Sequence, residues 1–279
     1  MDAYARPASL PEALAILAGG GWRMLAGGTD LYPGAGAHLA GPVLDLAGVA
    51  GLAGITAAGA PAPGLRIGAM TPWADIAGAD QPPALRALQQ AARTVGGRQV
   101  QVAGTIGGNL CNASPAADGV PPLLALAAEV ELVSGSGIRT LPLADFLTGP
   151  RQTALRPGEL LAALLIPRAG LQGRSAFVKL GARTHLVISI AMVAARIVFD
   201  QGRVTHAAVA VGSCSAVAQR LPAVEAALTG ATVEAAVSRV QTADVMPALS
   251  PIDDVRASAA YRGEAAVELV RRAVAGALP

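Results

Sequence analysis

The sequence has few aromatic residues and no concentration of positive charge. Phe, Trp and Tyr make up 3% of its 279 residues, which leaves few rings on which single-stranded nucleic acid stacks. The formal net charge is +2 and the arginines are scattered from Arg6 to Arg272, whereas a phosphate backbone calls for a concentrated basic patch. Nucleic-acid binding is therefore not expected.

Long apolar runs and cysteines are scarce as well. The most apolar stretch of helix length, 186–195, ends at Arg196 and is about half of a bilayer span. The first residues lack a basic segment followed by an apolar one, so no signal peptide is predicted. Two cysteines, Cys111 and Cys214, cannot form a disulfide framework of the secreted type. We therefore expect a cytoplasmic protein.

Several common catalytic motifs are missing. No G-x-G-x-x-G follows a strand and no Gly-Lys dipeptide exists, which argues against Rossmann and P-loop sites. The histidines, His38, His185 and His206, share no ligand spacing with each other or with cysteine, so no metal site is expected. No G-x-S-x-G motif is present, and nothing indicates a Ser-His-Asp hydrolase.

Two pairs of glycines are the most informative feature that is present. The first lies in Ala26-Gly27-Gly28-Thr29-Asp30, and the second lies about eighty residues later in Thr105-Ile106-Gly107-Gly108-Asn109. Each pair follows a short apolar or β-prone run and stands beside hydroxyl or amide side chains. Paired glycines allow backbone N–H groups to turn toward an anionic oxygen that a Cβ would hold away. Two such loops predict a pyrophosphate held from both sides, and hence a dinucleotide.

Periodicity and turn residues divide the chain into three units. Residues 1–56 are predicted to form a small α/β unit, whose first helix opens at the capping box Ser9-Leu10-Pro11-Glu12. Residues 57–170 form a second α/β unit, which begins with an Ala/Gly/Pro-rich linker or hairpin turn at 57–63. Residues 171–279 form an α+β unit, a three-stranded antiparallel sheet backed by helices. The strands expected there are 176–180, 188–199 and 203–211, and the helices are 222–228, 232–242 and 255–275.

Two charged residues are further candidates. Asp118 lies nine residues after Asn109, where its carboxylate could accept hydrogen bonds from ribose hydroxyls; alternatively, it caps the helix that follows. Lys179 is the only lysine beside 20 arginines and lies on a predicted strand. Its compact ammonium could meet a phosphate or the edge of a flavin ring, or it is a solvated strand residue.

These residues resemble the FAD-binding medium subunit of molybdenum hydroxylases. This family includes the flavoprotein subunit of carbon monoxide dehydrogenase and the flavin domain of xanthine dehydrogenase. The resemblance rests on both glycine motifs and on Ser114-Pro115-Ala116-Ala117-Asp118, and it continues through residues 146–155, 157–161 and 254–262. It covers nearly the whole chain in the expected order.

The resemblance implies a fold and a set of cofactor contacts. A vanillyl-alcohol-oxidase-like pair of α/β subdomains would hold FAD, followed by a C-terminal α+β domain. The two glycine motifs would hold the pyrophosphate, Ser114 and Asp118 the adenosine end or adjoining ribose, and Leu161 and Lys179 the flavin half. The FAD-binding residues predicted in this way are Ala26, Gly27, Gly28, Thr29, Asp30, Leu31, Thr105, Ile106, Gly107, Gly108, Asn109, Ser114, Asp118, Leu161 and Lys179.

The resemblance also implies a function within a complex. The molybdenum–pterin centre of a large subunit would oxidise the substrate, and an iron–sulfur small subunit would carry single electrons to FAD. FAD would pass them to NAD+, a quinone, a haem protein or oxygen, and the complex would be a dimer of heterotrimers. No residue of this chain is expected to be an obligatory acid or base. Two alternatives are a self-sufficient FAD oxidase or dehydrogenase and a flavin-free assembly scaffold.

The sequence departs from the family pattern in two places. Gln101 stands where an arginine is usual shortly before the second glycine motif, although Arg98 lies nearby. The segment 32–42 contains no lysine or arginine, unlike many relatives. The first departure affects a supporting contact rather than FAD binding itself.

Overall fold

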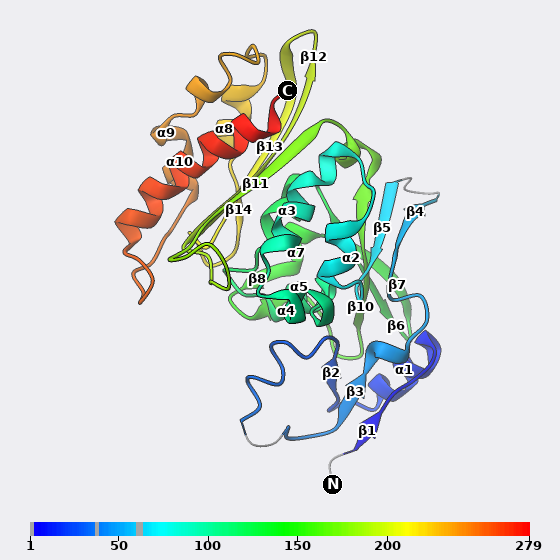
Figure 1. Ribbon diagram of the computed structural model, residues 1–279. Helices are drawn as coiled ribbons and strands as arrows, with labels where there is room; N and C mark the ends of the chain where they lie inside the picture. The colour runs from blue at the N-terminus through cyan, green and yellow to red at the C-terminus, as the bar shows by residue number, and fades with distance from the viewer. Residues whose placement is uncertain (1–2, 37–38, 60–63) are drawn as a thin grey trace.

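The structure is a computed structural model, which describes residues 3–36, 39–59 and 64–279 (Figure 1). Its first unit contains a parallel sheet with the strand order β1-β3-β2 and the helix α1. The bounds are β1 Tyr4–Ala5, α1 Leu10–Ala18, β2 Arg23–Leu25 and β3 Val43–Asp45. The predicted capping box forms in part: Ser9 Oγ accepts a hydrogen bond from the Glu12 N–H, while the Glu12 carboxylate accepts one from the Ala8 N–H.

The second unit is built on a sheet with the order β4-β5-β10-β6-β7. All of its neighbouring strands are antiparallel, so this sheet is not of the parallel type that is typical of α/β units. The strands are β4 Ile55–Ala58, β5 Gly64–Gly68, β6 Glu129–Ser134, β7 Gly137–Pro142 and β10 Leu160–Pro167. Ala58 pairs with Gly64, and residues 60–63 of the predicted linker lie outside the described residues.

Helices of the second unit pack on this sheet around a core that includes Trp73, Leu88 and Phe146. They are α2 Trp73–Gly78, α3 Arg86–Thr94, α4 Arg98–Ala103, α5 Ile106–Asn112, α6 Val120–Ala125 and α7 Leu143–Phe146, followed by the hairpin strands β8 Leu147–Gly149 and β9 Gln152–Thr153. In Figure 1 these helices lie between the second sheet and the C-terminal sheet. Ala87 and Ala91 of α3 and Ala125 of α6 also form a small cluster with Phe177 and Met192 of the C-terminal sheet, so these helices pack against both sheets.

The third unit contains a four-stranded antiparallel sheet, so the prediction of three strands is wrong. Its strands are β11 Arg174–Leu180, β12 Ala191–Asp200, β13 Arg203–Gly212 and β14 Gln219–Arg220. β14 was missed because two polar residues carry no alternating pattern. One face of the sheet contacts α10 (Ala259–Ala277), and the other contacts α3 and α6 of the second unit.

Two predicted helices of the third unit also need correction. Instead of a helix over 232–242, the chain forms turns, the short 3-10 helix η4 (Val237–Arg239) and then α9 (Thr242–Val245). The β-branched residues of this stretch disfavour a helix, and an isolated bridge between Arg203 and Thr232 fixes its start in extended form. The last helix begins at residue 259 rather than 255, after a turn; α8 (Pro222–Leu228) forms as predicted.

A buried arginine joins the third unit to the second. Arg196 on β12 is 3% exposed. Its guanidinium donates to the carbonyls of Ala125 at 2.8 Å, Ala169 at 3.3 Å and Gln172 at 3.2 Å. Burial lowers the pKa of Arg196 to about 10, which still leaves it charged at neutral pH. None of the described helices is long and apolar enough to cross a membrane.

Candidate functional site

A cavity of about 820 Å³ lies where the three units meet, within the size range of sites for small ligands and cofactors. Both glycine motifs line it, together with the segment 114–118 and Leu161. Of the residues predicted from the sequence, only Ile106 and Lys179 do not line it, because Ile106 is fully buried in the core and Lys179 lies behind Asp118. The structure therefore gathers both motifs at one cavity.

The first glycine motif is a loop that follows β2. The backbone N–H groups of residues 27–31 have no acceptor among the described residues, although all five residues line the cavity. Gly28 has a φ of +72°, which side chains disfavour, and a Cβ on Gly27 would lie 1.8 Å from the Ala103 carbonyl oxygen. The loop thus offers consecutive unpaired amides, a donor set that is suited to an anionic oxygen.

The second glycine motif is the start of helix α5, not the loop expected from the sequence. Thr105 is its N-cap, and Thr105 Oγ1 accepts from the Gly108 N–H at 3.1 Å. The Ile106 N–H donates to the Thr71 carbonyl and the Gly107 N–H to the Ala69 carbonyl. The amides of residues 106–109 are therefore already paired within the protein.

The glycines of the second motif serve close packing instead. A Cβ on Gly107 would lie 2.6 Å from the Ala69 Cβ and 2.7 Å from the Ala69 oxygen. A Cβ on Gly108 would come within 3.8 Å of the Ala26 Cβ in the first motif. The absence of a side chain at Gly107 allows α5 to approach the backbone that follows β5, whereas a Cβ on Gly108 would meet Ala26 at an ordinary van der Waals distance.

Polar side chains extend the wall beyond α5. Asn109 lines the cavity, and its Oδ1 is buried with no hydrogen-bond partner among the described residues. Arg151 also lines it; the Arg151 guanidinium donates to the Asn112 carbonyl at 3.2 Å and to the Asn112 side-chain oxygen. Arg151 was not predicted as a site residue, because its place at the wall depends on contacts with Asn112, 39 positions away in the chain, which leave no local signal in the sequence.

Asp118 is engaged by two side chains of the third unit. Its Oδ2 accepts from Lys179 Nζ at 2.6 Å, and its Oδ1 accepts from Ser189 Oγ at 2.6 Å. Burial raises the pKa of the Asp118 carboxyl, while Lys179 and then Ser189 oppose the rise. The alternative that Asp118 caps the next helix is wrong, because α6 begins after Gly119 without a side-chain cap.

Lys179 is likewise not a solvated strand residue, because its side chain is only 11% exposed. Besides Asp118, its Nζ contacts the Thr94 carbonyl at 3.5 Å. Lys179 thus acts on the cavity through the carboxylate of Asp118.

The loop 181–189 between β11 and β12 is a wall element that the sequence did not reveal. Its residues Leu186, Val187 and Ile188 line the cavity, and Leu186 and Ile188 are 58% and 52% exposed. A Cβ on Gly97 would lie 2.8 Å from Leu186 Cδ2, so the loop packs closely on the Gly96-Gly97 turn.

Two residues discussed from the sequence have limited roles at the cavity. Gln101, at the position of the usual arginine, donates its Nε2 to the Arg93 carbonyl at 2.9 Å and does not line the cavity. Cys111 does line it, but burial raises the pKa of its thiol to about 12. Its thiol is therefore a poor nucleophile at neutral pH.

Comparisons with known proteins show which family the chain belongs to. The family described as FAD binding domain in molybdopterin dehydrogenase matches residues 1–169, and the family described as CO dehydrogenase flavoprotein C-terminal domain matches residues 176–277. The nicotine 6-hydroxylase medium subunit of Paenarthrobacter nicotinovorans is 31% identical, over 97% of this chain and 95% of its own length.

Similarities to carbon monoxide dehydrogenases extend to solved structures. The carbon monoxide dehydrogenase medium chain of Afipia carboxidovorans is 31% identical over 97% of this chain and 94% of its own length. The structure of reconstituted CO dehydrogenase from Oligotropha carboxidovorans matches with a TM-score of 0.89 at 29% identity, covering 99% of this chain and 97% of that one.

The fold and the cavity define a dinucleotide-binding flavoprotein of the oxidoreductase class. The chain belongs to the family of FAD-binding medium subunits of molybdenum hydroxylases, and its cofactor is FAD. The resemblance seen in the sequence is confirmed by both family matches.

The residues at the cavity fit this cofactor. The first motif supplies consecutive unpaired amides, a donor set of the kind that a pyrophosphate needs. Asn109 Oδ1 provides a buried acceptor that lacks a protein donor among the described residues. Apolar surface from Leu161 and Val187 provides contacts of the kind that an aromatic ring system needs.

Proposed function

We propose that the cavity between the two glycine motifs holds FAD and that the N–H groups of residues 27–31 bind its pyrophosphate. This row of amides without described acceptors is the observation that carries the proposal. Charge-assisted hydrogen bonds from backbone amides to an anion are stronger than neutral ones, and donors that are already oriented need little reorganisation. The paired amides of α5 would shape the opposite wall rather than bind the anion.

The remaining predicted contacts keep their assignments as proposals. Ser114 lies beside the adenosine end or its ribose, and Leu161 beside the flavin half. Asp118 is held by Lys179 and Ser189, so its carboxylate keeps a fixed orientation toward the cavity. We assign Lys179 an indirect contact, since its ammonium neutralises a buried carboxylate at the cavity wall.

We further propose that this chain works with an iron–sulfur small subunit and a molybdopterin large subunit, as a dimer of heterotrimers in the cytoplasm. FAD supplies the conversion between single-electron delivery from the iron–sulfur subunit and reduction of an external acceptor, which is NAD+, a quinone, a haem protein or oxygen. The names of the relatives, medium subunits and medium chains, support such a multi-subunit assembly. We propose three domains at the predicted bounds 1–56, 57–170 and 171–279, and β4 (Ile55–Ala58), which pairs with β5, carries the chain across the first boundary.

FAD titration of the isolated chain tests the site. The chain has two tryptophans, and Trp73 lines the cavity, so Trp22→Phe leaves one emitter at the site. We expect FAD to quench the emission of Trp73 and to co-elute with the chain in gel filtration. A folded chain that neither retains flavin nor shows quenching would contradict the proposal and favour a flavin-free scaffold.

Purification of the tagged chain from its native cells tests the assembly. We expect flavin, iron and molybdenum to co-purify in a fixed ratio, and the substrate to reduce FAD only in the complete complex. A preparation with flavin alone that oxidises its own substrate would instead support the self-sufficient FAD enzyme.

A further inference from the structure

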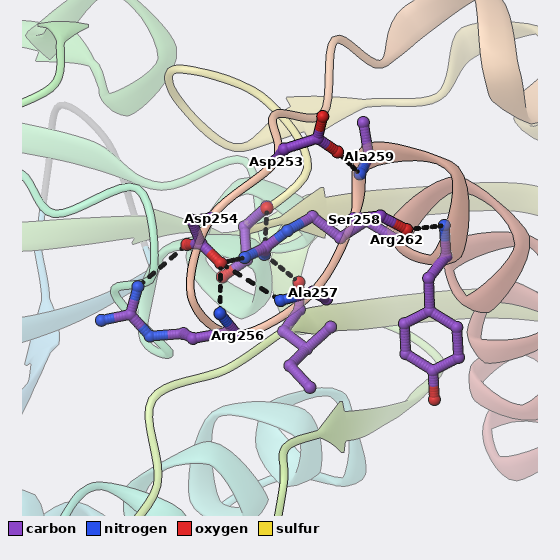
Figure 2. Close-up of polar contacts among 10 residues, drawn as sticks. Asp253, Asp254, Arg256, Ala257, Ser258, Ala259 and Arg262 are labelled. Atoms are coloured by element: carbon purple, nitrogen blue, oxygen red, sulfur yellow. Dashed lines mark hydrogen bonds and ion pairs between the residues drawn. The ribbon is translucent and has the colours of Figure 1, made fainter.

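Arg262 is a buried arginine that lies outside the cavity wall. It belongs to α10 and is 3% exposed. Its Nη1 donates to the Ile190 carbonyl at 2.5 Å and to the Ser213 carbonyl at 3.1 Å, while its Nη2 contacts Asp254 Oδ1 at 2.6 Å. Figure 2 shows this guanidinium beside the Asp254 carboxylate, at the turn that precedes α10.

Both carbonyls that Arg262 holds are connected to the cavity wall. Ile190 directly follows the loop 181–189, which contributes Leu186–Ile188 to the wall. The Ser213 N–H donates to the Pro115 carbonyl at 3.0 Å, and Pro115 lies within the wall segment 114–118. The Arg262 guanidinium therefore connects α10 to both wall segments, the loop 181–189 and the segment 114–118. These two segments contact each other where Ser189 Oγ donates to Asp118 Oδ1.

Two buried polar atoms without partners and one residue with an unfavourable backbone conformation lie around Arg262, and packing alone does not require them. Arg262 Nε and Ser213 Oγ are buried without hydrogen-bond partners among the described residues. Ser213 has a φ of +64°, an unfavourable conformation for a residue with a side chain. Unpaired buried polar atoms and backbone strain concentrate where a protein needs a fixed functional geometry.

Asp254 orients the guanidinium from the other side. Its carboxylate accepts from the Arg256 N–H at 2.8 Å and from Arg256 Nη1 at 2.9 Å, and these bonds hold its pKa well below the usual range. The carboxylate is therefore ionised at neutral pH and stays paired with Arg262. A planar guanidinium fork fixed in this way can hold two carbonyls at once, which the single ammonium of a lysine does less well.

We propose that Arg262 is a positioning residue for the flavin site: through the Ile190 and Ser213 carbonyls it sets the loop 181–189 and the segment 114–118 at the cavity. The inference rests on the proposed function, because it assumes that FAD occupies this cavity. Arg262 touches neither the cavity nor any residue assigned to the pyrophosphate.

The test compares Arg262→Met and Arg262→Lys with the control Arg271→Met in the full chain. Arg271 lies on the same helix and also donates to one backbone carbonyl, that of Val240, which is not part of the wall. We expect Arg262→Met to weaken FAD binding about tenfold. Hydrogen exchange in 181–190 and 113–118 of the FAD-free chain should rise, whereas Arg271→Met should change neither readout. Arg262→Lys should fall between Arg262→Met and wild type.

The outcomes separate this inference from the proposed function. If the wild-type chain binds no FAD, the proposed function fails. If the wild type binds FAD but Arg262→Met and Arg262→Lys bind it equally well, the positioning role is wrong. Arg262→Lys retains the charge and decides the question if Arg262→Met does not fold. Equal losses of affinity in the Arg262 variants and in Arg271→Met would reduce Arg262 to a general stabiliser of α10 and overturn the inference.

Discussion

Both motifs contain a pair of glycines but use these glycines differently. In the first motif the backbone N–H groups of residues 27–31 have no acceptor among the described residues. In the second, the N–H groups of residues 106–109 donate to Thr71, Ala69 and Thr105, and Gly107 lies against Ala69. Glycine thus permits an exposed row of donors in one place and a close backbone approach in the other. The comparison shows that a shared motif does not imply a shared role.

The largest expected effect is a loss of stability at the second motif, whose Gly107 packs closely against Ala69. Gly107→Ala places a Cβ 2.6–2.7 Å from Ala69 atoms, and overpacking of this kind costs about 1–3 kcal/mol of stability. We expect the FAD-free chain to lose that much unfolding free energy in urea titrations. Gly78→Ala is the control, because a Cβ there meets no described atom within 4 Å. An unchanged stability combined with lost FAD binding would mean that the second motif holds the anion.

Gly28→Ala tests the first motif, whose backbone N–H groups are the unpaired donors. An alanine at the Gly28 φ of +72° is strained by about 1–2 kcal/mol. Its Cβ would also lie 2.3 Å from the ring of Tyr32, which is 55% exposed and would have to move aside. We expect calorimetry to show FAD affinity reduced about tenfold or more, with a smaller change in the stability of the FAD-free chain. Gly20→Ala has the same φ of +72° away from the cavity and should leave FAD affinity unchanged. If Gly28→Ala and Gly20→Ala bound FAD with equal affinity, the first motif would not be the donor site that we propose.

The two threonines give a matched pair. Thr29 lines the cavity without a described hydrogen bond, whereas Thr105 Oγ1 caps α5. Thr105→Val should lower the unfolding free energy by about 1 kcal/mol through loss of the cap. Thr29→Val should leave stability nearly unchanged and lower FAD affinity by about 1 kcal/mol, the contribution of one hydrogen bond. Chemical denaturation measures the stability of both variants, and FAD titration measures their affinity. If Thr29→Val lost stability and Thr105→Val lost FAD affinity, Thr105 would be the residue that binds FAD and Thr29 the structural one.

The smallest effect concerns Asp118, which follows the second motif. Burial raises its folded-state pKa above the usual value of an aspartate side chain. At a pH between the pKa of Asp118 in the unfolded chain and its higher pKa in the folded chain, the folded chain binds more protons than the unfolded one. The contribution of this carboxyl to stability is therefore lost as the pH rises through the folded-state pKa. We expect the difference in unfolding free energy between wild type and Asp118→Asn to vary with pH in this acidic window. A difference that stays constant with pH would show that Lys179 cancels the effect of burial.

Much of this architecture could be predicted from the sequence. Alternating or continuous apolar residues marked β11, β12 and β13, and Ser9 with Glu12 marked the start of α1. The glycine motifs and Asp118 were found because small residues and an isolated carboxylate leave clear local patterns. The resemblance to the family added Leu161 and the fold, both of which depend on long-range organisation.

The remaining features depend on contacts between distant residues. The ion pair of Lys179 with Asp118 joins residues 61 positions apart, and the contact of Arg262 with Ile190 joins residues 72 apart. The paired state of the α5 amides depends on Thr71 and Ala69 from the chain that follows β5. No local period or propensity encodes such pairings. Sequence reasoning therefore located both motifs but could not tell which of them has free donors.

Hydrogen exchange of the two motifs, with and without FAD, tests the central claim most directly. In the FAD-free chain the amides of 27–31 should exchange rapidly, and FAD should slow them about tenfold or more, because binding gives them acceptors. The amides of 106–109 should be protected in both states. If FAD left 27–31 unchanged, or if the gain in protection fell on 106–109 instead, the assignment of the pyrophosphate to the first motif would be contradicted.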